Sequence, residues 1–168
     1  LRPIGIYGQF IAEMIGGWVP SLLLGTLPLL IVAPFLGIDV APSSPAAVPL
    51  FVLSIAFGVG VGTELDVFFS ACMVFLEQSV YALTQIRDAV SVLLSGAVLP
   101  LALLPWDLGE YLVWLPFAAL ASAPLQIYTG TGDPLFLLAL QAGWMLVLWP
   151  LAHGFWSLSR ERLVAHGG

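Results

Sequence analysis

The chain has no lysine and only four arginines, against ten acidic residues, which leaves a formal net charge of −6. Binding of nucleic acid depends on clustered lysine and arginine, so this class of function is excluded. Charged residues of both signs make up only 8% of the 168 residues, while 60% are hydrophobic. A soluble domain carries about a quarter charged residues. The composition therefore predicts one domain, residues 1–168, that is integral to a lipid bilayer.

Residues for catalysis and metal binding are equally scarce. Cys72 is the only cysteine, which excludes an internal disulfide and a thiolate metal cluster. His153 and His166 have no cysteine or carboxylate at metal-ligand spacing. No Walker motif and no G-x-S-x-G motif occurs, and Thr63 stands where a Rossmann loop beginning at Gly58 would need its third glycine. We therefore expect no catalytic residue, metal site or cofactor in this chain.

Long apolar runs are what the chain has instead. A spanning helix needs ~20 apolar residues, and four such runs are separated by polar or proline-rich segments. The second run is too long for one crossing, because a continuous helix over it would reach about 48 Å. Either its inner end projects into the cytoplasm or the helix breaks near Gly62. We expect an all-α, polytopic membrane domain with spans at about 18–38, 46–77, 84–104 and 134–159.

Residues 1–14 form an amphipathic segment that is too short and too polar to span a membrane. Apolar residues recur there at helical spacing, and polar residues lie between them. The pattern predicts a helix that lies at the cytoplasmic surface of the membrane. Its apolar face carries Ile4, Tyr7, Ile11 and Met14, and its polar positions are Arg2, Gln9 and Glu13.

The four arginines predict the orientation. With four spans, all of them fall on one side, which the positive-inside rule makes cytoplasmic. The loops on the other side carry acids and no arginine. We therefore expect a multi-pass protein of the inner (plasma) membrane, with both ends of this chain cytoplasmic. The inner residues are Arg2, Arg87, Arg160 and Arg162, and the outer residues are Asp39, Asp107, Glu110 and Asp133.

The segment between the last two spans, residues 105–132, is neither a simple loop nor a span. Asp107 and Glu110 have the spacing of a capping box, with Asp107 as the N-cap of a short helix. Pro116 and Pro124 then interrupt apolar runs whose length, ~10–14 residues, suits re-entrant or interfacial segments. We expect two short helical pieces that enter the outer leaflet and turn back as a hairpin.

Glu64 and Asp66 lie past the middle of the second apolar run. Carboxylates within hydrocarbon are costly and usually serve as proton relays or substrate contacts. At the inner headgroup level, in contrast, water solvates them, and we favour this placement. Two residues apart on a helix, they point about 200° away from each other. They are therefore candidate residues of a pathway or gate and not a paired acid/base site.

Small residues supply further candidates. Gly58 and Gly62 match the G-x-x-x-G pattern of closely packed membrane helices, so we expect them to pack helices together. Ser95 and Gly96 come directly before the proline-broken outer segment, where small residues allow a close approach. The further candidates for a pathway or gate are Ser95, Gly96, Pro116 and Pro124.

An ordered set of short motifs runs through the second half of the chain: Leu94–Leu101 (LSGAVLPL), Leu104-Pro105, Leu115-Pro116-Phe117, Pro124, Gln141 and Trp144. This order resembles the permease subunits of type-2 ATP-binding-cassette exporters, in particular their compact six-span bacterial subgroup. In that subgroup the leucine-serine-glycine stretch with its proline opens a broken outer hairpin, and the later prolines lie inside the hairpin.

The resemblance implies a transport protein that binds no nucleotide itself. It implies pairing with a second copy or a sister permease, and with two cytoplasmic ATPase subunits that hold ATP and Mg²⁺. It also implies two further spans upstream of Leu1. The chain departs from the subgroup at the inner end of the second expected span. Members often have a Phe-Trp pair there, whereas this chain has Phe75-Leu76-Glu77.

We therefore expect a permease subunit of an ATP-driven exporter, with no enzymatic activity of its own. Two alternatives stay open. One is a fragment of a proton-coupled secondary transporter, with Glu64 or Asp66 as the carrier. The other is a membrane-embedded enzyme or assembly protein without a transport role. Under the exporter hypothesis, the residues expected to contact the ATPase are Arg2, Tyr7, Gln9 and Glu13.

Overall fold

The computed structural model of the chain describes residues 27–37, 39–76 and 80–167, together with single positions at 9, 12, 16, 20 and 24. Every regular element within these ranges is a helix, so the described part of the protein is all-α, as the composition predicts. The chain divides into two compact units, Leu1–Ser43 and Ser44–Gly168.

The first unit contains a short helical segment before a proline-rich turn. Helix α2 spans Leu27–Val32 and is followed by the 3-10 helix η2, Ala33–Leu36. Pro34 lies in the first turn of η2. Backbone N–H groups in a first turn have no partner within the helix, so proline, which lacks an N–H, is tolerated there. Gly37 ends the segment with a φ of 75°. Part of the span expected at 18–38, mostly in its first half, lies outside the described residues.

Two long helices dominate the second unit. Helix α3 spans Ala47–Leu76 and helix α7 spans Pro134–Gly167. Within the described residues, these are the two helices that are long and apolar enough to cross a membrane. They coincide with the second and fourth expected spans, although α7 continues past residue 159.

Helix α3 is continuous through Gly62, so the alternative of a break at that glycine is wrong. Its 30 residues correspond to about 45 Å, which is longer than the ~30 Å of hydrocarbon in a bilayer. Such a helix either tilts or projects beyond the hydrocarbon at one end. The other alternative, in which the inner end of the helix extends into the cytoplasm, stays a prediction.

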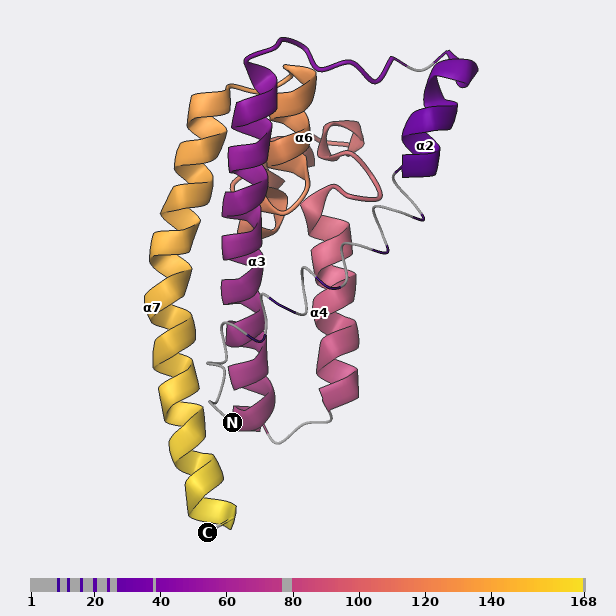
Figure 1. Cartoon of the computed structure of the whole chain (residues 1–168). Coiled ribbons are helices and arrows are strands. Elements are labelled where there is room, and N and C mark those ends of the chain that lie inside the picture. Colours follow the sequence, from indigo (N-terminus) through magenta and orange to yellow (C-terminus); the bar gives the residue numbers. More distant parts are fainter. Residues whose placement is uncertain are drawn as a thin grey trace. The chain divides into compact units, whose positions relative to one another are not determined.

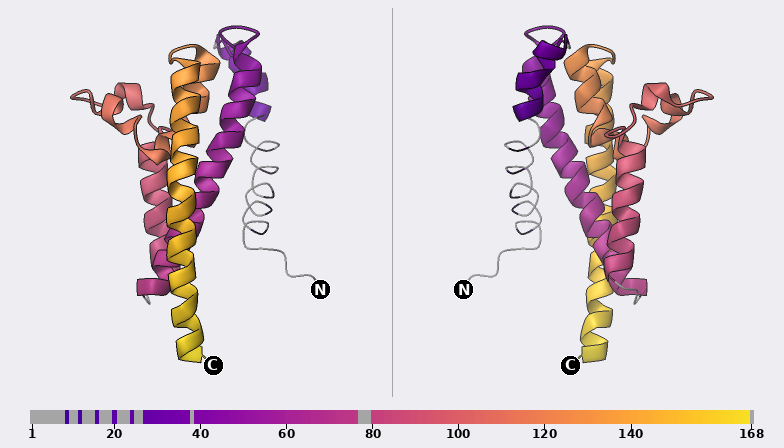
Figure 2. Two further views of the ribbon diagram at one scale, coloured as in Figure 1. Left: turned by 90° about the vertical axis from the view of Figure 1, so that its left-hand side faces the viewer. Right: turned by 90° about the vertical axis from the view of Figure 1, so that its right-hand side faces the viewer.

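Helices α3 and α7 run in the same direction and pack along each other (Figure 1). The side views show that they cross obliquely (Figure 2). Two clusters of buried apolar residues fill this contact, and both include residues from the segment that precedes α7. The first cluster is Val61, Leu65, Ala119 and Leu148, and the second is Ala123, Ile127, Leu137 and Leu138.

Helix α4, Val80–Ser95, is shorter than expected. Its 16 residues reach about 24 Å, less than the ~30 Å of a full crossing. It ends at Ser95 instead of residue 104 because Gly96 adopts a left-handed conformation, with a φ of 78°, that terminates the helix. It also begins four residues before the span expected at 84–104, and Arg87 lies within the helix.

The outer segment, residues 97–133, folds as a series of short helices: η3 Leu101–Leu103, α5 Leu108–Leu112, η4 Pro116–Ala119 and α6 Ser122–Thr129. Pro116 is the first residue of η4 and Pro124 lies in the first turn of α6. Each proline therefore lies in the first turn of a helix, where the backbone N–H groups have no partner within the helix. Between residues 105 and 132 the structure has three short helices where two pieces were expected.

The capping box expected at Asp107 and Glu110 does not form. Helix α5 does begin directly after Asp107, but that side chain makes no capping hydrogen bond. An N-cap residue normally has β-region dihedrals that aim its side chain at the first turn. Asp107 instead has a φ of 56° and a ψ of 19°, so its carboxylate is directed elsewhere. Only the backbone bond from the Glu110 N–H to the Asp107 carbonyl remains, at 3.0 Å.

Candidate functional site

The outer segment is attached to α3 by a close backbone contact. Gly58 is buried in α3, and a Cβ added there would lie 2.8 Å from the carbonyl oxygen of Ala119 in η4. Only glycine permits this approach without displacing η4. Two residues along, and so on a different side of α3, Gly60 faces Met145 of α7, where an added Cβ would lie 2.6 Å from the methyl carbon. Gly62 is also buried.

A fully buried hydrogen-bond network joins α3, η4 and α7. Gln141 is 1% exposed and Ser54 is 0% exposed. The Gln141 Nε2 group donates to the carbonyl oxygens of Ser54, at 3.0 Å, and Ala119, at 2.9 Å. Its Oε1 atom accepts a bond of 2.9 Å from Ser54 Oγ. Every polar atom of the Gln141 side chain is thereby satisfied, as burial in an apolar surrounding requires.

Aromatic residues reinforce this attachment at two further points. The Trp144 indole Nε1–H donates to the carbonyl oxygen of Trp114, at 2.9 Å, which ties the turn after α5 to α7. The rings of Phe51 and Tyr128 lie 5.0 Å apart between α3 and α6. The outer segment is therefore bound to α3 and α7 by backbone, amide and aromatic contacts together.

The junction between α4 and the outer segment is compact. Ser95 Oγ accepts a bond of 3.3 Å from the Ala97 N–H and is buried, at 3% exposed. A Cβ added at Gly96 would lie 3.1 Å from the Leu101 side chain and 3.3 Å from Ser122. Ser95 and Gly96 thus lie where α4 ends and the outer segment begins. Pro116 and Pro124 are buried farther along that segment.

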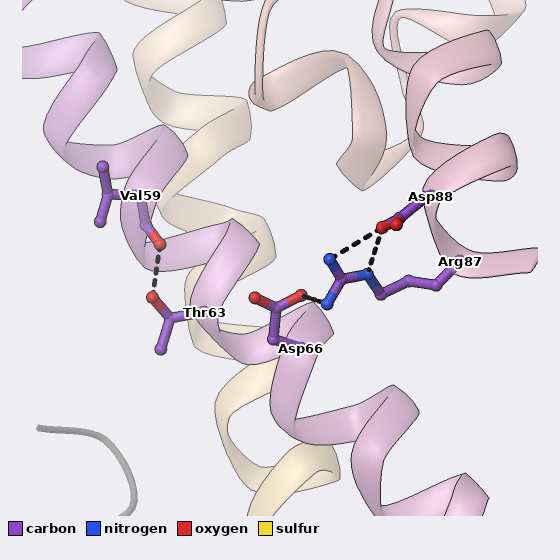
Figure 3. A network of polar contacts seen from close by, with 5 residues as sticks. All are labelled: Val59, Thr63, Asp66, Arg87 and Asp88. Atoms are coloured by element: carbon purple, nitrogen blue, oxygen red, sulfur yellow. Dashed lines mark hydrogen bonds and ion pairs between the residues drawn. The ribbon is translucent and has the colours of Figure 1, made fainter. Parts of the chain in front are cut away.

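A charge cluster connects α3 to α4 (Figure 3). Arg87 Nη1 lies 2.6 Å from Asp66 Oδ1, and Arg87 Nη2 lies 2.9 Å from Asp88 Oδ1. The same Asp88 oxygen accepts a bond of 3.1 Å from Arg87 Nε. The guanidinium group thereby bridges the two helices through its planar fork of donors.

Glu64 lies in the same turn of α3 and is 7% exposed. Because α3 is an uninterrupted helix here, two residues separate the carboxylates by about 200° around the axis. Glu64 and Asp66 therefore do not form a paired site. Thr63 directs its hydroxyl to the Val59 carbonyl oxygen, at 2.8 Å, within the same helix (Figure 3).

Three of the four residues expected to contact an ATPase, Arg2, Tyr7 and Glu13, lie outside the described residues. The fourth, Gln9, is helical and exposed.

Sequence reasoning missed the residues that hold this arrangement together. Ser54 and Gln141 have no partner nearby in the chain, and their only signal is a polar side chain within an apolar run. Such residues in membrane helices often hydrogen-bond across helices. Arg87 was expected only as a residue of the inner side, and nothing in its local sequence identifies Asp66 as its partner.

Comparison with known proteins agrees with the order of motifs. The family model described as ABC-2 family transporter protein matches residues 1–167. No curated protein and no solved structure matches the chain. The family match covers nearly all of the sequence, including α3, α4, the outer segment and α7. The chain therefore belongs to the ABC-2 transporter family, as a membrane permease of type-2 ATP-binding-cassette transporters.

Proposed function

We propose that the chain is the membrane-spanning permease subunit of an ATP-driven export system. The observation that carries this proposal is the family match over residues 1–167, on a chain without a nucleotide-binding motif. ATP and Mg²⁺ then belong to separate cytoplasmic ATPase subunits. The permease lines the export path together with a second copy of itself or a sister permease.

The charge cluster supports an orientation with the end of α3 and the start of α4 on the cytoplasmic side. Asp66 lies about 28 Å along α3 from Ala47, close to the ~30 Å thickness of the hydrocarbon. With Ala47 at the outer boundary, Arg87 and its two carboxylates lie at the inner boundary, where the positive-inside rule favours arginine. We propose an inner (plasma) membrane location with both ends of the chain cytoplasmic.

The contact at Gly58 supports a re-entrant outer segment. Gly58 lies about 16 Å along α3 from Ala47, roughly half of the ~30 Å of hydrocarbon. Ala119 contacts α3 at this level, so η4 and α6 would enter the outer leaflet and return. Backbone that is not lipid-exposed is tolerated at such depth when it is packed against protein, and η4 packs against both α3 and α7.

Within this frame, the junction at Ser95 and Gly96 is the hinge of an outer gate. Gly96 already has a backbone conformation that ends α4, and small residues let α4 move against its neighbours without a clash. The outer segment stays attached to α3 and α7 through Gln141. Pro116 and Pro124 keep its short helices separate, and Glu64 and Asp66 lie near the inner mouth of the path.

Copurification tests the proposal. The full-length protein, purified from its native membranes in a mild detergent, is expected to carry a nucleotide-binding ATPase subunit that mass spectrometry identifies. Cells that contain both proteins should export a labelled lipid, glycan or dye from a test panel. That export should stop on ATP depletion and continue with a protonophore.

The rival hypotheses predict other outcomes. Transport that a protonophore abolishes and ATP depletion spares would favour the proton-coupled secondary transporter. Absence of both an ATPase partner and any transport would favour a membrane assembly protein.

A further inference from the structure

A cavity lies within the outer segment, apart from the network around Gln141. It has a volume of about 520 Å³, is open to the surface, and is lined by residues of the junction after α4, of α5 and of α6. This volume is within the range of roughly 300–1,000 Å³ that is typical of pockets for small molecules. Its apolar lining includes Pro100, Leu101 and Leu104. The cavity therefore has the size and the hydrophobic surface to hold the body of a small organic ligand.

The charge of the cavity is of one sign. Asp107 and Glu110 line it and are both exposed, so both carboxylates are accessible to a ligand that enters from the surface. In the part of the chain that the structure describes, neither carboxylate has an ion-pair or hydrogen-bond partner, and no arginine or histidine lines the cavity. An anionic ligand would be repelled there, and a cationic group would meet two carboxylates.

The lining also offers hydrogen-bonding groups. Ser122 is 7% exposed and lines the cavity, where its Oγ accepts a bond of 2.9 Å from Gln126 Nε2. Thr129 and Thr131 line the cavity as well, and their hydroxyls lie 3.0 Å apart. These groups are fixed by one another, so they are pre-organised before any ligand enters.

We propose that this cavity binds a small amphipathic amine. The apolar body of the ligand lies against Pro100, Leu101 and Leu104, and its ammonium group lies between Asp107 and Glu110. A role of the site in taking up or releasing an exported molecule rests on the proposed export function. The binding itself requires neither ATP nor an ATPase.

Fluorescence binding to the full-length protein in phosphatidylcholine nanodiscs tests this site, with empty nanodiscs as the blank. The probes are dansylcadaverine, a primary amine on an apolar fluorophore, and its N-acetylated form, which has the same body without the charge. The amine is expected to bind about tenfold more tightly than the acetylated form, because exposed ion pairs contribute a few-fold each. Equal binding of the two probes, or no binding of either, would overturn the proposal.

Matched variants assign the effect to the cavity. Asp107→Asn with Glu110→Gln removes both charges from the rim and should abolish the preference for the amine. Asp39→Asn with Asp133→Asn removes the same charge from two acids that do not line the cavity, and should preserve the preference. In the parent protein, Asp39 accepts a hydrogen bond from the Ala41 N–H and Asp133 accepts one from the Leu135 N–H. The side-chain oxygen of asparagine can accept the same bonds. A rim variant that retains the preference contradicts the proposal.

A steric variant gives an independent readout. Thr131→Trp places a large ring at an exposed position on the cavity wall and should weaken binding of both probes. Unchanged binding in this variant would place the probes elsewhere and overturn the site. Because no ATP is present, a negative result here leaves the export proposal standing, and a failure of ATP-driven export leaves the binding result standing.

Discussion

At the scale of single residues, the glycines of this chain have distinct roles that their spacing alone does not reveal. Gly58 has no room for a Cβ because the Ala119 carbonyl lies against it. Gly143 in α7 has nothing within 4 Å of its added Cβ. The same substitution at the two positions therefore isolates the effect of contact from that of helix propensity.

We predict that Gly58→Ala destabilises the protein by about 1–3 kcal/mol, because η4 must move away from α3 or α3 must distort. Gly143→Ala should be neutral or stabilise the helix by up to about 1 kcal/mol, since alanine is the better helix former. Thermal unfolding of the detergent-solubilised protein measures both. If the two variants unfold at the same temperature, η4 does not pack on α3 in this way.

The two carboxylates of α3 differ in their surroundings. Asp66 forms an ion pair with Arg87 across the helices, whereas Glu64 is buried on another side of α3. For a permease driven by ATP, we predict that Glu64→Gln with Asp66→Asn lowers export but leaves it measurable, because neither carboxylate carries the driving ion. Initial rates of ATP-driven export are compared with those of the parent at equal expression. Complete loss of export by a well-expressed variant would instead favour the proton-carrier hypothesis.

At the scale of elements, the outer segment behaves as part of the α3 and α7 pair. Gln141 satisfies acceptors on both α3 and η4, and Trp144 holds the turn before η4. If the Gln141 side chain were removed, its buried partners would be left without a hydrogen bond. The free-energy cost of an unsatisfied buried group is larger than the net contribution of the hydrogen bond to stability. The contacts of the segment thus favour its movement together with α3 and α7, and we propose Gly96 as a separate pivot for α4.

The amphipathic segment 1–14 is the element that we expect to contact the ATPase and to couple ATP hydrolysis to transport. We predict that Arg2→Glu combined with Glu13→Lys weakens association with the ATPase subunit, because both charges on the polar face are reversed while the apolar face is intact. Membrane insertion should be unchanged. Copurification of the ATPase with the tagged permease measures the association, and fractionation of membranes provides the control. A double variant that binds the ATPase and exports like the parent would exclude this helix as the coupling element.

At the scale of the whole molecule, the topology is the property on which the other proposals depend. We predict that single cysteines at Ser43 and Thr131, in a Cys72→Ser background, react with a membrane-impermeant thiol reagent from outside the cell. A cysteine at Ser159 should react only after the membrane is opened, because the C-terminal part of α7 is expected on the cytoplasmic side. Labelling of position 159 in intact cells would reverse the proposed orientation.

Several properties of this protein follow from the sequence by itself. The shortage of charge and the long apolar runs determine a helical membrane protein, because a backbone in hydrocarbon must satisfy its hydrogen bonds locally. Pro116 and Pro124 determine that residues 105–132 cannot be one helix. The order of short motifs was sufficient to identify the family. These are local or cumulative properties, and they do not depend on which residues meet in space.

Only the tertiary structure decided the rest. The position of Gly96 against Leu101 and Ser122, where α4 meets the outer segment, depends on how the following segment folds back, which no local pattern specifies. The bond between Ser54 and Gln141 joins residues that are 87 positions apart. A polar residue in an apolar run signals that a partner exists, but any of several helices could supply it. The cavity likewise arises where the short helices of the outer segment fail to fill the space between them, so its presence depends on packing and not on composition.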